Sequence, residues 1–247
     1  MINLEVCANS LTSALAAQEG GAIRVELCDN LNEGGTTPSY GQIKMARESL
    51  NIKLYVLIRP REGDFLYSDI EFEIIKADVQ YCIDAGCDGV VIGILNADGS
   101  IDKARCSELV QMARKAGLGV TFHRAFDMCN NMDQALEDII ELGCQRILTS
   151  GGESTASEGA NVITRLIEKA AGRIIIMPGS GVSESTVADL VHITKANEIH
   201  SSARSAVKSK MQYHNDHLSL SNNSTDELSI TVTDVQKVKD IIRLANF

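Results

Sequence analysis

A glutamate followed two residues later by a cysteine occurs twice near the start of the chain. Glu5-Val6-Cys7 and Glu26-Leu27-Cys28 both lie within short apolar runs. Side chains alternate between the two faces of a β-strand, so each Glu shares a face with its Cys. A carboxylate can act as a general acid or base, and a thiolate is a preferred ligand of the soft ion Cu(I). These four residues are the first candidates for a functional site.

The two cysteines have two interpretations. Cys7 and Cys28 are either small buried apolar residues or a two-thiolate metal site, in which Cys129 could be a third ligand. No C-x-x-C motif supports the metal site by spacing. The remaining cysteines fall on predicted helix faces or strand starts, where we expect structural roles: Cys82, Cys87, Cys106 and Cys144.

Cationic residues follow two later apolar runs, with Arg59 and Arg61 after one and His123 and Arg124 after the other. A buried carboxylate needs a cationic partner, and we expect these four residues to supply partners for the two glutamates. The result would be either a structural ion-pair network or a polar catalytic pocket.

In the catalytic interpretation, His123 or a carboxylate is the general base and the two arginines of the first run stabilise charge. Asp127 either orients Arg124 or takes part in catalysis. The catalytic candidates are therefore Glu5, Glu26, Arg59, His123 and Asp127.

Three loops rich in glycine and serine, at 149–152, 179–183 and 200–202, follow apolar runs. Backbone N–H groups at the start of a helix attract anions, although glycines in such loops can also serve tight turns. The candidate anion-binding residues are Arg61, Arg124, Ser150, Gly151, Gly179, Gly181 and Ser201.

Eight short apolar runs alternate with eight amphipathic patterns, which favours a (β/α)8 TIM-type barrel over a doubly wound open sheet. The length of 247 residues fits one barrel domain over 1–247. Ser10, Ser39, Asp102 and Ser183 are expected helix N-caps, and a polar mobile loop is expected near 208–231. The predicted strands lie near 2–7, 22–28, 53–59, 89–93, 119–123, 146–150, 173–178 and 198–201. The predicted helices lie near 10–19, 39–49, 69–85, 102–116, 131–142, 159–171, 183–195 and 233–245.

Composition narrows the possible partners. The net charge of −10 argues against non-specific binding of nucleic acid or of an anionic membrane. The first residues lack the pattern of a signal peptide, and no apolar run is long enough for a transmembrane span. Seven cysteines without a C-x-x-C pair indicate reduced thiols and a cytoplasmic location.

An ordered series of motifs resembles the CutC family of copper homeostasis proteins over about the first 220 residues. The motifs are Glu5-Val6-Cys7, Glu26-Leu27-Cys28, 34–39 (GGTTPS), 58–61 (IRPR), 63–67 (GDFLY), 121–127 (TFHRAFD), 148–151 (LTSG) and 200–203 (HSSA). The resemblance implies a TIM-type barrel, a role in copper handling and self-association into a homo-oligomer. It also implies that Cys7 and Cys28 are the copper thiolates.

Two classes of function therefore remain open. One is a copper homeostasis protein that binds Cu(I) through thiolates at the mouth of the barrel. The other is a barrel enzyme that acts on a small anionic or phosphorylated substrate, because one fold hosts many functions.

Overall fold

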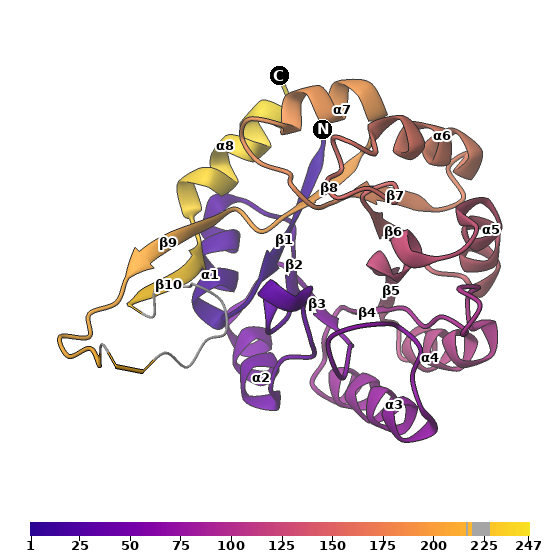
Figure 1. Cartoon of the computed structure of the whole chain (residues 1–247), viewed down its shortest axis with the longest axis horizontal. Helices are drawn as coiled ribbons and strands as arrows, with labels where there is room; N and C mark the ends of the chain where they lie inside the picture. The colour runs from indigo at the N-terminus through magenta and orange to yellow at the C-terminus, as the bar shows by residue number, and fades with distance from the viewer. Residues whose placement is uncertain (216, 219–227) are drawn as a thin grey trace.

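The computed structural model describes residues 1–215, 217–218 and 228–247. In these residues strands and helices alternate along the chain, and the helices form a ring outside the strands (Figure 1). The strands are β1 Asn3–Ala8, β2 Arg24–Leu27, β3 Lys53–Leu57, β4 Gly89–Ile92, β5 Gly119–Phe122, β6 Arg146–Thr149, β7 Ile175–Pro178, β8 Glu198–Ser201, β9 Arg204–Lys208 and β10 Ser229–Thr233. The α-helices are α1 Leu11–Gly20, α2 Tyr40–Ser49, α3 Asp69–Asp84, α4 Lys103–Lys115, α5 Met132–Leu142, α6 Ala160–Ala170, α7 Val187–Thr194 and α8 Val235–Ala245. Two short 3₁₀ helices are η1 Leu31–Glu33 and η2 Arg124–Met128.

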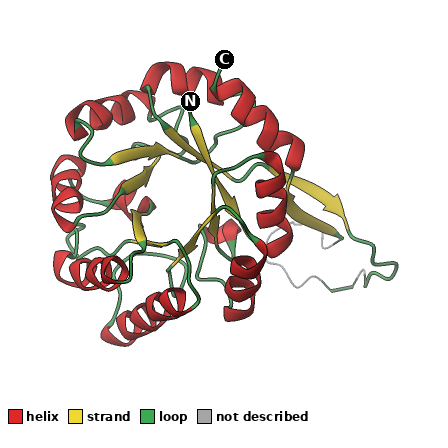
Figure 2. Ribbon diagram, turned by 180° about the vertical axis from the view of Figure 1, so that it is seen from behind, coloured by secondary structure: helices red, strands yellow, loops and turns green. Residues whose placement is uncertain are grey.

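The strands β1 to β8 form one parallel sheet, with the order β7-β6-β5-β4-β3-β2-β1-β8. Because β8 pairs with β1, the sheet curls into a nearly closed barrel, seen end-on in Figure 2. This confirms the predicted (β/α)8 fold and excludes the open doubly wound sheet. No helix in the described part of the chain has the length and apolar character needed to span a bilayer.

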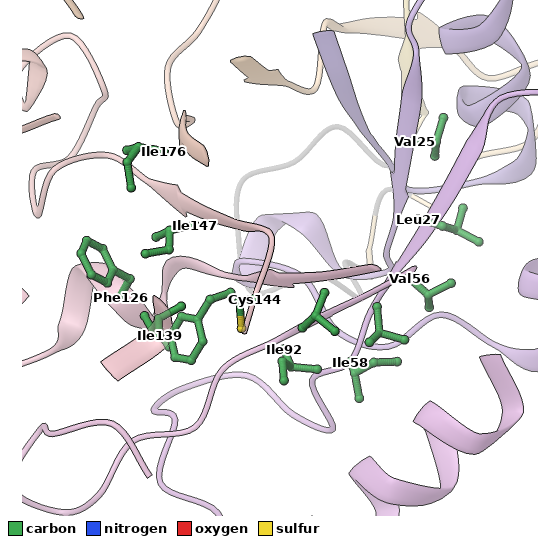
Figure 3. Packing of buried hydrophobic residues seen from close by; sticks show 14 of the residues in the cluster. Val25, Leu27, Val56, Ile58, Ile92, Phe126, Ile139, Cys144, Ile147 and Ile176 are labelled. Carbon is green, nitrogen blue, oxygen red and sulfur yellow. The ribbon is translucent and has the colours of Figure 1, made fainter. Parts of the chain in front are cut away.

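The two faces of each strand belong to different apolar clusters. Val25, Leu27 and Val56 join the large cluster between the strands and the helices (Figure 3). Cys7 and Cys28 instead join a small cluster inside the barrel, with Tyr55, Leu57 and Val91. The alternation predicted for β1 and β2 is therefore confirmed, and it places both Glu-x-Cys pairs inside the barrel.

Three of the four predicted helix caps are present. The side chains of Ser10, Ser39 and Asp102 each accept a hydrogen bond from the backbone N–H three residues later. The prediction for Ser183 is wrong, because α7 begins only at Val187. The backbone N–H of Ser183 donates to Oγ1 of Thr186 at 3.0 Å, which closes a turn before the helix.

The predicted loop near 208–231 contains strand residues at both of its ends. Strands β9 and β10 pair antiparallel and form a hairpin that projects from the ring of helices (Figure 1). The loop prediction is therefore wrong for Lys208 and for Ser229 to Thr231. In β10, the consecutive β-branched residues from Ile230 to Thr233 favour a strand. The rest of that prediction falls partly on residues 216 and 219–227, which lie outside the described residues.

Candidate functional site

A cavity of about 590 Å³ opens at the carboxyl ends of the strands, where active sites of this fold lie. Several residues singled out by the sequence line it: Cys7, Glu26, Arg59, His123, Arg124, Gly181 and Ser201. Others lie below the cavity or in the loops around it: Glu5, Cys28, Arg61, Asp127, Ser150, Gly151 and Gly179. The mouth of the barrel therefore collects part of the predicted site, and the following contacts show how each group is held.

The two thiols of the Glu-x-Cys pairs face each other at the base of the cavity. Sγ of Cys7 lies 3.4 Å from Sγ of Cys28, and both cysteines are free and buried. Contact with the Cys28 sulfur, followed by burial, raises the pKa of the Cys7 thiol well above its ordinary value. Without a bound cation, Cys7 is therefore a neutral thiol near pH 7.

Glu5 lies one pleat below Cys7 and forms two ion pairs. Its carboxylate accepts a hydrogen bond from Nε of Arg24 and another, at 2.8 Å, from Nδ1 of His200. Burial alone would raise the pKa of Glu5, but the charge of Arg24 and the bonds to His200 and Arg24 lower it to about 2. Glu5 is therefore ionised and fully paired.

His200 lies between two carboxylates. Its Nδ1 contacts Glu5, and its Nε2 lies 3.6 Å from Oε2 of Glu26. Burial by itself lowers the pKa of His200, but hydrogen bonds to Cys7 and Glu5 and the charge of Glu26 raise it well above 6.5. Burial also raises the pKa of Glu26. One potential metal-ligand atom from each of Cys7, Glu26 and His200 lies within 4.8 Å of the other two.

A layer of charged residues fills the barrel below this group. Glu198 accepts hydrogen bonds from Nη2 of Arg24 and, at 3.1 Å, from Nε of Arg146. Nη1 of Arg146 donates to the hydroxyl of Tyr55 at 3.2 Å. These groups are buried and mutually satisfied, so they form a structural floor for the cavity.

The sequence pointed to the wrong partners for the glutamates. Among the described residues, the ion pairs of Glu5 and Glu26 are with Arg24 and His200, and not with Arg59, Arg61, His123 or Arg124. The alternation Glu198-Ile199-His200 in the eighth strand is the signal that could have identified His200 and Glu198. Because β8 closes the barrel against β1, Glu5 and His200 are direct register partners.

The opposite wall of the cavity contains Arg59, Phe65 and His123. The guanidinium of Arg59 donates to the backbone oxygens of Glu33, Gly35 and Gly63 at 2.7 to 2.9 Å. The loops that follow β2 and β3 are thereby tied together over the mouth.

His123 on this wall is buried, and its Nδ1 accepts a hydrogen bond from the backbone N–H of Ala125 at 3.1 Å. Burial first, and then the charge of Arg59, lowers the pKa of His123 to about 3, so the imidazole is neutral at pH 7.

Asp127 occupies the position where an anion was expected. Its carboxylate accepts hydrogen bonds from the backbone N–H groups of Ser150 and Gly152 at 3.1 and 3.2 Å. It also pairs with Nε of Arg124 at 2.7 Å. The loop after β6 therefore binds a carboxylate of its own chain, and Asp127 orients Arg124.

The other expected anion donors are also used within the chain. Gly151 donates its N–H to the side-chain Oγ1 of Thr149 at 2.8 Å. Gly179 donates its N–H to the backbone oxygen of Thr149 at 3.0 Å. Ser201 donates its hydroxyl to the Val182 oxygen at 2.6 Å.

Arg61 pairs with Asp64 at 2.9 Å and with Glu71 at 2.5 Å. Cys129 packs against the core outside the barrel strands. Gly181 still lines the cavity, and its anion role stays a prediction.

Comparison with known proteins gives one consistent result. The model of the CutC family matches residues 2–205. A family protein CutC of Chromobacterium violaceum is 50% identical over 236 residues, which is 96% of this chain and 95% of that protein. The human copper homeostasis protein cutC homolog is 46% identical over 243 residues, 98% of this chain and 88% of that protein. The crystal structure of a CutC protein from Streptococcus agalactiae matches with a TM-score of 0.77 and 36% identity, covering 82% of this chain and 99% of that one.

Proposed function

The chain belongs to the CutC family, and from this membership we propose that it is a cytoplasmic copper homeostasis protein that binds Cu(I) at Cys7 and Cys28. The observation that carries the proposal is the distance of 3.4 Å between the two sulfurs. Two thiolates that share one ion lie within twice the metal–sulfur distance, roughly 2 × 2.3 Å if zinc is the guide. The two sulfurs are therefore close enough to share one ion.

The charges around the thiols favour a cation. Contact with the Cys28 sulfur, then burial, then the charges of Cys28 and Glu26 raise the pKa of the Cys7 thiol, and burial raises the pKa of Glu26, so a negative charge at the sulfurs is repelled. A monovalent cation at the sulfurs would offset this repulsion and would bind the thiolate form, since metal binding displaces thiol protons. His200 lies within reach of the same position and could be a third ligand.

The choice of Cu(I) follows from the donor set. Thiolate sulfur and imidazole nitrogen suit Cu(I), whereas magnesium and calcium prefer sites made of oxygen atoms. The name of the human relative supports a role in copper homeostasis. The seven free cysteines support a reducing compartment such as the cytoplasm. Self-association stays a prediction from the family resemblance.

Anaerobic titration of the full chain with Cu(I), against a competing chelator, tests the proposal. We expect one tightly bound ion in the wild type and none in the double variant Cys7→Ser/Cys28→Ser. Cys82→Ser and Cys106→Ser are matched controls, because both residues are fully buried outside the cavity. An unchanged stoichiometry in the double variant would refute the copper site.

A further inference from the structure

Arg59 is a buried cation without a carboxylate partner among the described residues. Arg59 is 5% exposed, and its guanidinium donates three hydrogen bonds to backbone oxygens. Four other arginines at or below the mouth each pair with a carboxylate: Arg24, Arg61, Arg124 and Arg146. A buried charge without a counter-charge is costly, so the position favours an anion.

Two of the N–H groups of the Arg59 guanidinium make no hydrogen bond to the backbone. A guanidinium has five N–H donors, and three of those on Arg59 bind the oxygens of Glu33, Gly35 and Gly63. Nε has no hydrogen-bond partner, and Nη2 makes only one bond. The Nε–Nη2 edge can therefore donate two parallel hydrogen bonds, which is the geometry that binds a carboxylate.

His123 supplies a further unpaired donor on the same wall. Because its Nδ1 accepts the Ala125 N–H, the single proton of the neutral imidazole is on Nε2. Nε2 is buried and has no partner. The ring of Phe65 lies 5.0 Å from the imidazole and 5.0 Å from Cζ of Arg59, so it packs against both groups. All three residues line the cavity of about 590 Å³.

We propose that Arg59 and His123 are the binding site for the carboxylate of a small molecule. The ligand enters through the cavity, displaces the ring of Phe65, and accepts hydrogen bonds from Nε and Nη2 of Arg59 and from Nε2 of His123. The rest of the molecule then lies in the cavity and faces Cys7 and His200. The site uses neither thiol, so it does not depend on copper binding.

The surroundings favour a monocarboxylate over phosphate. The backbone donors of the loop after β6, which could hold a phosphate, already bind Asp127. A single negative charge with two oxygens therefore matches the free donors best.

NMR of the full chain with ¹⁵N-labelled histidine tests the proposal, with acetate and pyruvate as probes. The chain has five histidines, and the His123→Asn variant identifies the signals of His123. We expect both probes to shift the Nε2 signal of His123 saturably. Acetamide, which is neutral and has nearly the same shape as acetate, should leave it in place.

His123→Asn is the variant that removes the donor and keeps the local fold. The amide oxygen of asparagine can accept the Ala125 N–H in place of Nδ1, while the Nε2–H group is lost. Affinity for pyruvate, measured by calorimetry, should fall about tenfold, as expected for one hydrogen bond to a charged group. His192→Asn on α7, outside the cavity, should bind pyruvate like the wild type.

Three results would overturn the proposal: a His123 signal that saturating pyruvate does not move, an acetamide shift equal to that of acetate, or tighter binding of phosphate than of either carboxylate. The first two are measured on the wild type, so they hold even if the variant folds poorly. Cu(I) titration of the same proteins reports on the copper site separately, because Cys7 and Cys28 are unchanged.

Discussion

Nδ1 of His200 lies 2.8 Å from Oε1 of Glu5, although the two residues are 195 positions apart in the sequence. They are direct neighbours in the pairing of β1 with β8, which closes the barrel. The same carboxylate pairs with Arg24, so one buried group connects strands β8, β1 and β2. The orientation of the imidazole at the thiol site is thus a consequence of barrel closure.

Glu5→Gln should be strongly destabilising. The amide keeps the shape of the side chain but removes the carboxylate that Arg24 and His200 share, and breaking a buried ion pair costs about 3–5 kcal/mol. Urea unfolding monitored by circular dichroism measures the loss. The exposed Glu19→Gln is the control, with an expected change of about 0.5 kcal/mol or less. A loss as small as the control would show that the ion pair is not needed.

The stability of the chain should fall in acid partly through His123. The pKa of this imidazole is about 3 in the folded protein against an ordinary 6.5. Below pH 6.5 the unfolded chain therefore takes up a proton that the folded chain does not. The free energy of unfolding then decreases by up to about 1.4 kcal/mol per pH unit between these values. His123→Asn should have a shallower slope of stability against pH from 6.5 to 4, and parallel slopes would disprove the assignment.

Asp127→Ala should open an anion site that the native chain fills. Loss of the carboxylate removes the acceptor of Nε of Arg124 and of the N–H groups of Ser150 and Gly152, so the melting temperature should drop. Sodium formate should restore part of the loss, because a ligand that binds only the native state stabilises it. Sodium chloride at equal ionic strength should restore less. Equal effects of the two salts, or a formate effect of the same size on the wild type, would contradict this prediction.

Gly179→Ala should disturb His200. A Cβ atom at Gly179 would lie 2.5 Å from Cδ1 of Leu148 and 3.2 Å from Cβ of His200. We expect a loss of about 1–3 kcal/mol from overpacking, together with weaker Cu(I) binding if His200 is a ligand. Gly41→Ala in α2 is the matched control, since its nearest contact is at 3.9 Å and alanine favours a helix. If Gly41→Ala destabilises the chain as much as Gly179→Ala, the loss at Gly179 is not due to overpacking against His200.

The alternation of residues was enough to predict the barrel and its inward faces. It placed Cys7 and Cys28 inside, because Val6 and Leu27 have to face the helices. It did not identify His200, since strand pairing at the point of closure joins residues from opposite ends of the chain. The alternation Glu198-Ile199-His200 indicates that Glu198 and His200 share a face, but it does not show that His200 lies beside Glu5.

For the loop after β6, the sequence was insufficient for a different physical reason. The loop after β6 does have the composition and the N–H donors of an anion site, but Asp127 supplies the anion. A sequence shows the donors and does not show that a side chain 23 residues away already satisfies them. For Arg59 the sequence is insufficient in the opposite sense, because it shows a cation and several acids. Only the structure shows that the acids near Arg59 pair with other residues.

The structural floor of the cavity determines from which end of the barrel a ligand can enter. It consists of Arg24, Arg146, Glu198 and Tyr55. These side chains are buried and block the interior below Glu5, so the described residues leave the cavity accessible from its mouth and not from the opposite end. An ion at the proposed Cys7 site would then enter and leave through this cavity, whose lining includes Arg59 and His123. A small molecule bound to Arg59 and His123 would obstruct this route. The rates at which the ion binds and dissociates would therefore depend on whether the small molecule is bound.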